Sequence, residues 1–392
     1  MRRAVIVDAV RTPMGRRGGQ FKDIHPVDLA SLPLKALVER NDLDPELVED
    51  VIMGCVMQTG EQGVNVGRNA VLAAGFPETT VGTTIDRQCG SSQQSAHFAA
   101  QGVMAGAYDV VVAAGVESMT RVPMGITAMQ GPGKPFGPLM HERYDGQLVP
   151  QGISAQLVAE KWGISRQEQD ELALESHRRA ARATEEGRFE TQIIPVEVTR
   201  EDGTTEVVTR DEGIRYETTL EKLSSLQPAF DPSHTITAGN ASQITDGSAA
   251  MLIMDEDTAE RLGLEPMAAF KAFSLAGADP VLMLTAPIPA TEKALARAGL
   301  TADDIDLFEI NEAFASVPIA WRMEHGGTDP MALWERTNVN GGAIALGHPL
   351  GASGARIMTT LVHEMVRSGA TYGFQSMCEG GGMANGTILE RV

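Results

Sequence analysis

The sequence is poor in basic residues, and this limits the partners that the protein can have. It contains 32 lysines and arginines against 52 aspartates and glutamates, which gives a formal net charge of −20 over 392 residues. Nucleic-acid binding requires a basic surface, and no block of lysine and arginine occurs here, so we expect no nucleic-acid partner. An anionic substrate would need a local basic patch that works against the overall negative charge.

Cysteine is scarce as well, since the chain has only Cys55, Cys89 and Cys378. A small odd number in a long chain does not indicate a disulfide framework, and we therefore expect a reducing compartment, the cytoplasm. No two of these cysteines have the C-x-x-C spacing of a zinc site, so no metal is expected.

Long apolar runs and nucleotide-binding motifs are also missing. No stretch approaches the roughly 18 apolar residues of a membrane span, and the first apolar run ends at Asp8, too early for a signal peptide. No P-loop motif occurs, and no G-x-G-x-x-G opens a helix after a strand. We therefore expect neither a membrane span nor a nucleotide cofactor of the Rossmann type.

Short apolar segments alternate with helical patterns in the N-terminal third of the chain. Residues 4–10, 50–57 and 109–116 are rich in β-branched residues and predict strands buried on both faces. Residues 27–40 and 63–74 predict helices. This alternation indicates an α/β fold with a largely parallel sheet.

Residues 117–248 interrupt this pattern and predict an inserted region with its own structure. A charged helical segment covers 155–189, with an expected interruption near Gly163, and a strand pair is expected around 201–203. The α/β pattern returns at 304–311, a strand that leads into a helix. The two ends of the chain also form a weak internal repeat, which would bring reactive residues from both halves to one interface.

Cys89 lies in the segment IDRQCGSSQQS, directly before a clear helical pattern. A thiol at a helix N-terminus is close to the positive end of the helix dipole, which favours the thiolate. Gly90 leaves room for a carbonyl group to approach. The alternative is a buried structural cysteine.

His348 lies between glycines in NGGAIALGHPLGASGAR, a tight loop where core packing explains a histidine poorly. It could act as a general base or as a hydrogen-bond donor. The alternative is a turn histidine exposed to solvent. The other seven histidines have no such setting, and we interpret them as structural or surface residues.

Cys378 opens the segment CEGGG at the end of a predicted strand. The backbone N–H groups of these glycines could form an oxyanion hole beside a second thiol. Asn311 and Glu312, where a strand becomes a helix, could cap that helix or hold a catalytic water. Cys55 is interpreted as a packed small hydrophobe.

Together, these segments resemble the thiolase family. The resemblance rests on VDAVRTPMGRRGG, QCGS, TAGNASQITDGSAA, NEAFA, NVNGGAIALGHPLGASGAR and CEGGGMANGT, all in family order. It implies two similar α/β halves in a five-layer α-β-α-β-α arrangement with an inserted loop domain. We expect an N-terminal half over 1–265, which includes the loop domain at about 117–248, and a C-terminal half over 266–392.

The resemblance also implies a mechanism. The Cys89 thiolate, formed with His348 as base, would attack the keto carbon of a 3-oxoacyl-CoA and become acylated. Cys378 would protonate the departing acetyl-CoA carbanion and later deprotonate the incoming CoA. One oxyanion hole would comprise His348 and a water held by Asn311, and the other the backbone N–H groups of Cys89 and Gly380.

For binding of CoA, the resemblance implies Ser242 near the pantetheine and Arg215 near the nucleotide end. CoA would be a substrate, and no cofactor is expected. Family members resemble dimers or tetramers, so we expect a homodimer or homotetramer. Pro150 and Gln151 stand where acetoacetyl-CoA-specific members commonly carry His-Met, which favours a degradative 3-oxoacyl-CoA thiolase of open chain length.

Two alternatives remain at this point. A 3-oxoacyl synthase of the same superfold would use one cysteine with two histidines, whereas Cys378 stands in place of the second histidine here. A catalytically silent thiolase-like protein that binds CoA esters or lipids would be expected to have lost Cys89, His348 or Cys378, and all three are present.

Overall fold

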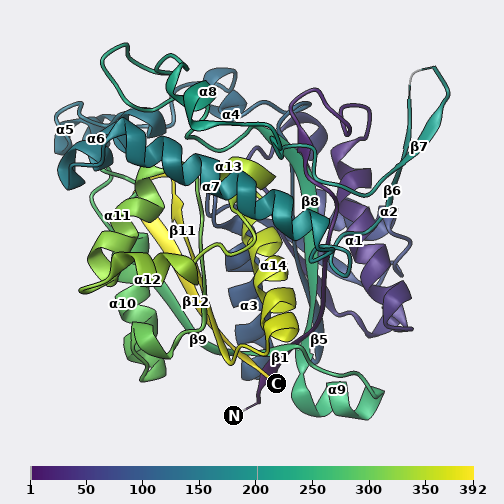
Figure 1. The fold of residues 1–392 in the computed structure, drawn as a ribbon. Helices are drawn as coiled ribbons and strands as arrows, with labels where there is room; N and C mark the ends of the chain where they lie inside the picture. The colour runs from purple at the N-terminus through teal and green to yellow at the C-terminus, as the bar shows by residue number, and fades with distance from the viewer. Residues whose placement is uncertain (1, 201) are drawn as a thin grey trace.

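The computed structural model describes residues 2–200 and 202–392. Its main feature is a mixed sheet with the strand order β10-β11-β12-β9-β1-β8-β5-β3-β4, with β2 attached to β8 (Figure 1). The strands of this sheet are β1 (Ala4–Arg11), β2 (Gly15–Arg16), β3 (Asp50–Gly54), β4 (Val81–Ile85), β5 (Val110–Ser118), β8 (Thr245–Asp255), β9 (Ala268–Gly277), β10 (Leu307–Ile310), β11 (Tyr372–Glu379) and β12 (Met383–Arg391).

Helices cover the outer faces of the sheet and also pack between its two halves. They are α1 (Pro26–Arg40), α2 (Val66–Ala73), α3 (Ser91–Ala105), α4 (Ile126–Met129), α5 (Pro138–Arg143), α6 (Gln151–Trp162), α7 (Arg166–Glu185), α8 (Leu220–Ser224), α9 (Glu256–Leu262), α10 (Pro287–Ala298), α11 (Ser316–His325), α12 (Pro330–Glu335), α13 (Ala343–Leu346) and α14 (Ser353–Ser368). Within residues 2–200 and 202–392, no helix has the length and apolar character that a bilayer crossing requires.

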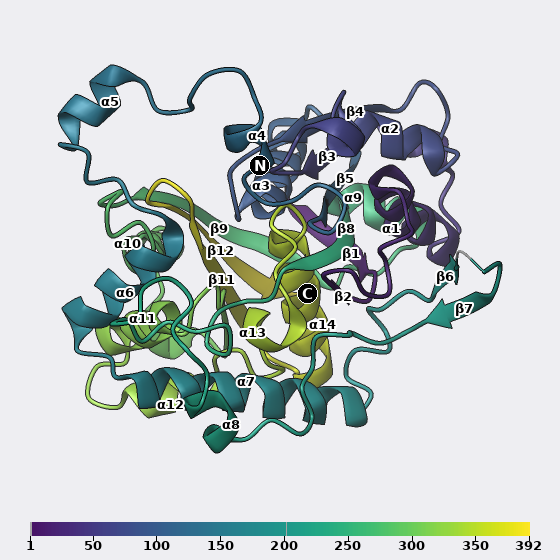
Figure 2. The same ribbon diagram turned by 90° about the horizontal axis from the view of Figure 1, so that it is seen from above.

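The sheet consists of two halves that are only weakly joined. Strands β1 and β9 pair through Val5 with Ala269 and Ile6 with Ala268, and this short contact connects the halves. Helices α3 and α14 pack against each other between the halves (Figures 1 and 2). Helices α1 and α2 cover the outer face of the N-terminal half, and α10 covers the outer face of the C-terminal half. The expected five-layer α-β-α-β-α arrangement is therefore confirmed.

The expectation of a largely parallel sheet is wrong. Among the strands of the described residues, only the pairs β3–β4, β3–β5 and β10–β11 are parallel, whereas β8 lies antiparallel to both β1 and β5. The reason is the insertion: β5 ends at Ser118, which pairs with Asp246 near the start of β8. The chain returns at the end of the sheet where it left, so β5 and β8 form a very long hairpin rather than a crossover unit.

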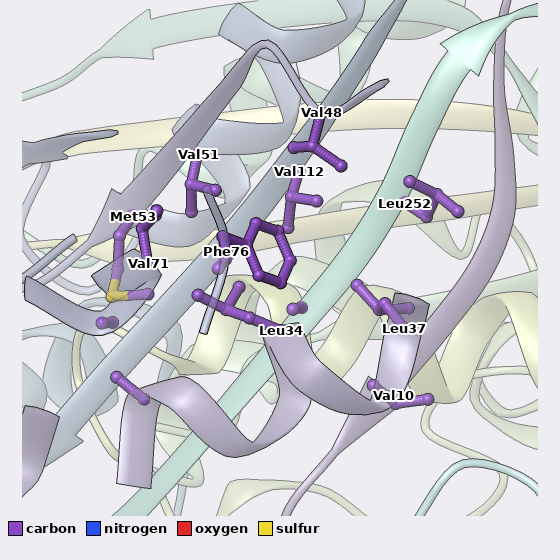
Figure 3. Packing of buried hydrophobic residues seen from close by; sticks show 14 of the residues in the cluster. Val10, Leu34, Leu37, Val48, Val51, Met53, Val71, Phe76, Val112 and Leu252 are labelled. Carbon is purple, nitrogen blue, oxygen red and sulfur yellow. The ribbon is translucent and has the colours of Figure 1, made fainter. Parts of the chain in front are cut away.

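Side chains on alternating faces of the strands pack into two separate hydrophobic cores. Val51 and Met53 of β3 and Val112 of β5 point outward and pack with Leu34 of α1 and Val71 of α2 (Figure 3). Their neighbours point inward instead, into a second core against the central helices. Because both faces of each strand are buried, the strands are almost continuously apolar in sequence.

The inserted region lies at the end of the sheet where β5 stops. The helical segment predicted over 155–189 forms α6 and α7, and Gly163, with φ +65°, ends α6 as expected. The predicted strand pair is the antiparallel hairpin β6 (Val196–Thr199) and β7 (Thr205–Val208), whose turn contains residue 201, outside the described residues. Figure 2 shows α5 on a segment that extends away from the sheet.

Glycines bring the N-termini of the two central helices together. A Cβ added to Gly354 of α14 would lie 2.2 Å from the backbone nitrogen of Gln93 in α3, and one added to Gly54 would lie 2.4 Å from the backbone nitrogen of Ser92. The backbone N–H of Ala355 also donates to Ser92 Oγ at 2.8 Å. This close approach places the loop before α3 next to the loop before α14, and these loops carry Cys89 and His348.

Candidate active site

Cys89 lies two residues before the start of α3, as the sequence predicted. Its side chain is 4% exposed and packs in an apolar cluster. The buried members of that cluster are Val56, Met57, Cys89, Met119, Val122, Leu350, Ile357 and Met377. The residue before it, Gln88, has φ +49°, a left-handed conformation that turns the chain sharply from β4 into α3.

The Cys89 thiol rests in its protonated form. Burial, and then the carboxyl group of Glu379, raise its pKa to about 12, although the Gln151 side chain and the backbone of Gly380 act in the opposite direction and lower the pKa. The expectation that the helix N-terminus favours a thiolate is therefore wrong for the resting protein. Desolvation outweighs the dipole and the hydrogen bonds, so a base must remove the proton.

Cys378 is the second buried thiol at this place, at 1% exposure near the end of β11. Burial raises its pKa, and the neighbouring Cys89 and Glu379 raise it further. Asn311 directly follows β10, the strand parallel to β11, and its backbone N–H donates to the Ser376 carbonyl at 3.1 Å. Parallel strands end at the same edge of a sheet, and this brings Asn311 to the edge that carries Cys378.

His348 is buried at 4% exposure, so the alternative of a solvent-exposed turn histidine is wrong. Its Nδ1 lies 2.5 Å from Ser353 Oγ, and that hydroxyl group donates to the Pro349 carbonyl at 2.8 Å. Since the hydroxyl proton is already used, Nδ1 carries the proton and donates to Ser353. Nε2, which lies 3.5 Å from Asn311 Nδ2, then presents a lone pair.

The charge state of His348 agrees with this arrangement. Burial, and then the positive charge of Arg356, lower the pKa of the imidazole to about 3. The ring is therefore neutral at physiological pH and can accept a proton at Nε2. Its backbone N–H donates to Thr245 Oγ1 at 3.0 Å, which fixes the loop against the start of β8.

Ser242 and Arg215 are the two residues expected to bind CoA. Ser242 lies near the residues that carry the thiols, whereas Arg215 does not. The Ser242 backbone N–H donates to the Ala313 carbonyl at 2.9 Å, so the segment TAGNAS runs beside NEAFA. Arg215 is exposed and lines two neighbouring surface pockets. Tyr216 and Lys222 line the first pocket, and Arg178 and Arg182 of α7 belong to the second.

Four basic side chains therefore gather at these pockets, together with the acidic Glu185 and Glu217. We call Arg178, Arg182, Arg215 and Lys222 the basic rim. Of these four residues, only Arg215 was expected from the sequence. The run RRAARA on α7 was a signal for the other arginines, because residues four apart on a helix project from the same face.

Glu117, which was not expected from the sequence to have a role, is fully buried near the end of β5. Its carboxylate accepts hydrogen bonds from the backbone N–H groups of Val56 at 2.9 Å, Met57 at 3.1 Å and Gly351 at 2.8 Å. It thereby ties the loop after β3 to the loop that follows His348. An acidic residue directly after the apolar run predicted as a strand over 109–116 was the available signal.

The surroundings of Glu312 and Cys55 indicate structural roles. Glu312 accepts hydrogen bonds from Ser176 Oγ at 2.6 Å, Asn338 Nδ2 at 2.9 Å and the backbone N–H of Ile344 at 3.2 Å. It holds α7 and α13 together and does not serve as a helix cap. Cys55 is completely buried in the outer core of the N-terminal half, as interpreted from the sequence.

The comparisons with known proteins agree with this site. The thiolase N-terminal domain model matches residues 4–257, and the thiolase C-terminal domain model matches residues 264–391. The chain is 48% identical over its whole length to a steroid 3-ketoacyl-CoA thiolase of Mycobacterium tuberculosis, of which the match covers 95%. It is 46% identical to a 3-ketoacyl-CoA thiolase of Aliivibrio fischeri, with both chains fully covered.

A solved structure shows the same fold. The crystal structure of the Bacillus anthracis acetyl-CoA acetyltransferase superposes with a TM-score of 0.90 at 39% identity, covering 100% of this chain and 99% of that one. Sequence, fold and both domain models thus agree over nearly the entire chain, and the protein belongs to the thiolase family.

Proposed function

We propose that the protein cleaves 3-oxoacyl-CoA with coenzyme A, and that the reaction is reversible as a Claisen condensation. The products would be acetyl-CoA and a shortened acyl-CoA. As a thiolase, the protein is an acyltransferase. The observation that carries the proposed chemistry is a neutral imidazole with an available Nε2 in a buried site that also holds two protonated thiols.

In the first half of the reaction, His348 Nε2 removes the proton of the Cys89 thiol. The sulfur attacks the 3-oxo carbon, and the bond between C2 and C3 then breaks with its electron pair moving to C2. Cys378 gives its proton to that carbon, so acetyl-CoA leaves and Cys89 remains as an acyl thioester. The raised pKa of Cys378 supports this role, because an acid with a high pKa remains protonated until the carbanion forms.

In the second half, the Cys378 thiolate removes the proton of an incoming CoA thiol. The CoA sulfur attacks the acyl carbon of the thioester, and the Cys89 thiolate leaves and recovers a proton from the imidazolium of His348. All protons return to their starting atoms, so the cycle needs no cofactor beyond the CoA substrate. A covalent thioester replaces one difficult step with two easier ones.

Backbone and side-chain donors would stabilise the oxyanions. The Gly380 N–H group, which lowers the pKa of the Cys89 thiol, is suited to an oxyanion that forms on the carbon bonded to that sulfur. We assign His348 and a water held by Asn311 to the other oxyanion. The support for this is that Asn311 Oδ1 is buried and accepts no hydrogen bond from any described residue.

Bound CoA would extend from the basic rim to the thiols. Its phosphates suit the arginines and lysine of the rim, and Ser242 lies along the inward path to pantetheine. The acyl chain would contact the apolar cluster around Cys89, which favours a lipid-derived acyl group. We therefore propose a degradative role of the fatty-acid β-oxidation type, in agreement with the names of the relatives.

We further propose a homo-oligomer that resides in the cytoplasm. Strand β4 forms one edge of the sheet, contains no charged residue, and exposes 55% of Val81. Exposed edges of this kind readily pair with another strand, here the β4 of a second copy, which would give a dimer; pairs of dimers would give a tetramer. The three cysteines are all buried and form no disulfide, which suits a reducing compartment.

A substrate panel tests the proposed function. Purified protein is mixed with free CoA and 3-oxoacyl-CoA esters of short, medium and bulky acyl groups, and loss of the 3-oxo thioester absorbance is followed. We expect turnover with at least one ester and none with the Cys89→Ser variant. Binding of the esters without any turnover across the panel would instead support the catalytically silent alternative.

A further inference from the structure

Glu379, the residue between Cys378 and Gly380, is buried without a hydrogen bond. Its exposure is 0%, and neither of its carboxyl oxygens has a hydrogen-bond partner among the described residues. Its side chain lies against Gly90, where an added Cβ would lie 2.0 Å from Glu379 Oε1. The backbone amide of Asn385 approaches the carboxyl group without reaching hydrogen-bond geometry. A buried carboxylate that lacks donors is costly, and this one needs an explanation.

The side chain of Asn385 presents a second acceptor to the same place. Its Nδ2 donates to Gln94 Oε1 at 3.1 Å and to His97 Nδ1 at 3.3 Å. Its Oδ1 has no partner among the described residues and lies 2.6 Å from the same added Cβ of Gly90. The Glu379 oxygen and the Asn385 oxygen are therefore close neighbours beside Gly90.

The direction of this network follows from His97. Burial lowers the pKa of His97 to about 3, so the ring is neutral and carries a single proton. Nδ1 accepts from Asn385, and Nε2 therefore donates to Thr387 Oγ1 at 2.7 Å. With Nδ2 of Asn385 directed at Gln94 and His97, its oxygen lies on the side of Gly90, where Glu379 Oε1 also lies. Two acceptors that face each other need one proton between them.

We propose that Glu379 is a neutral carboxylic acid in the active protein, and that its O–H donates to Asn385 Oδ1. Glu379 would then be a positioning residue for the thiols, since its neutral form keeps a negative charge away from Cys89 and Cys378. The proposal rests on the proposed function, because it explains how a buried site can hold a thiolate and a developing carbanion next to a glutamate.

The proposal has a direct consequence for alkaline pH. The titratable or charged groups that face Glu379 are Arg87, in the loop before α3, His97 of α3, and the two thiols. Burial raises the pKa of Glu379 to about 8, although Arg87 lowers it. Above that pH the carboxylate places a negative charge beside both sulfurs. The thiolate of Cys89 then becomes harder to form. The increase in Cys89 reactivity with rising pH is therefore smaller than it would be beside a neutral group.

The first experiment measures the rate of Cys89 alkylation and the rate of thiolysis between pH 6.5 and 9.5. In Glu379→Gln the amide donates to Asn385 Oδ1, as the protonated acid does, but it cannot ionise. We expect the ratio of the rate at pH 9 to the rate at pH 7 to be about tenfold higher in Glu379→Gln than in the wild type. Equal ratios would overturn the proposal.

Glu309→Gln is the matched control. Glu309 is the other buried glutamate with a pKa raised to about 8, and burial is again the main cause. It lies on β10 and interacts with Arg356, Glu312 and Glu364 rather than with the thiols. We expect this variant to keep the wild-type pH ratio. A higher ratio in Glu309→Gln than in Glu379→Gln would assign the alkaline effect to the wrong carboxyl group and overturn the proposal.

The second experiment does not depend on turnover. The infrared difference between wild type and Glu379→Gln at pH 7 should contain the carbonyl stretch of a protonated carboxyl group, and this band should disappear by pH 9.5. A carboxylate band at pH 7 would overturn the proposal and would mean that the Asn385 amide is reversed, with Nδ2 directed at Glu379. Because the spectrum reports protonation alone, failure of the thiolase assignment would leave this result unaffected.

Discussion

His348 Nδ1 lies 2.5 Å from Ser353 Oγ, and this contact decides which nitrogen of the imidazole can act as a base. Ser353 begins α14, and its hydroxyl group donates to the Pro349 carbonyl, so the hydroxyl oxygen can only accept from the ring. The proton is thereby held on Nδ1, and Nε2 keeps its lone pair, 3.5 Å from Asn311 Nδ2. The start of a helix thus sets the tautomer of a residue in the preceding loop.

Replacing Ser353 by alanine should lower kcat by about 10- to 100-fold with little change in KM, since the base loses its fixed tautomer but the substrate contacts remain. Steady-state kinetics on the best ester of the panel would measure both parameters. Ser368→Ala is the control, because Ser368 lies at the other end of α14 and its hydroxyl group donates only to Glu364 O. A similar loss in both variants would assign the effect to the helix and not to the imidazole.

Replacing Cys378 by alanine should separate acylation from turnover. The acid that protonates the acetyl-CoA carbanion is lost, so we expect kcat to fall by about 100- to 10,000-fold. Cys89 would remain available, and intact-mass analysis after incubation with an acyl-CoA should still show one acyl adduct. Cys55→Ala is the control and should turn over like the wild type, because Cys55 belongs to the outer core. A Cys378→Ala variant with the wild-type rate would remove Cys378 from the acid–base role.

Replacing Gly90 by alanine should destabilise the protein through a steric clash. The new methyl group would lie 2.0 Å from Glu379 Oε1 and 2.6 Å from Asn385 Oδ1, and both side chains are buried. We expect the free energy of unfolding to fall by about 1–3 kcal/mol, as for overpacking in a core. Gly137→Ala is the control, since an added Cβ has no neighbour within 4 Å there and φ is −80°. Equal midpoints of denaturant unfolding for both variants would contradict this prediction.

Buried neutral histidine should make the protein sensitive to acid. The pKa of His97 is about 3 in the folded protein against an ordinary value of 6.5, so the unfolded chain binds a proton that the folded protein does not. The folded-state pKa is depressed, and the associated stability is therefore present above pH 6.5 and is lost as pH falls toward 3. Below pH 6, His97 alone should lower the free energy of unfolding by about 1.4 kcal/mol per pH unit.

Urea unfolding at pH 7, 6 and 5 would measure this slope. His97→Gln should be less stable than the wild type at pH 7, because it loses an acceptor for Asn385, but its stability should fall less steeply with acid. His141→Gln is the control, since His141 is exposed on α5, and it should keep the wild-type slope. An unchanged slope in His97→Gln would show that other groups dominate the acid response.

The order of elements followed from the sequence because apolar periodicity and glycine placement are local properties. The periodicity located the segments that became β1, β3 and β5 and the helices α1 and α2, and Gly163 marked the end of α6. The strand directions could not be predicted in the same way. Whether β8 lies parallel or antiparallel to β5 depends on the end of the sheet at which a long insertion returns, and no local pattern records this.

In the candidate active site, too, some features follow from the local sequence and others only from the tertiary structure. The sequence by itself indicated the proposed reactive groups, Cys89, His348 and Cys378, through their flanking glycines and the order of the motifs. Only the tertiary structure decided their protonation states, because the burial that raises the pKa of Cys89 and lowers the pKa of His348 depends on residues distant in the chain. Burial outweighs the dipole of a single helix, so a thiol that its own sequence predicts to ionise is protonated in the folded protein.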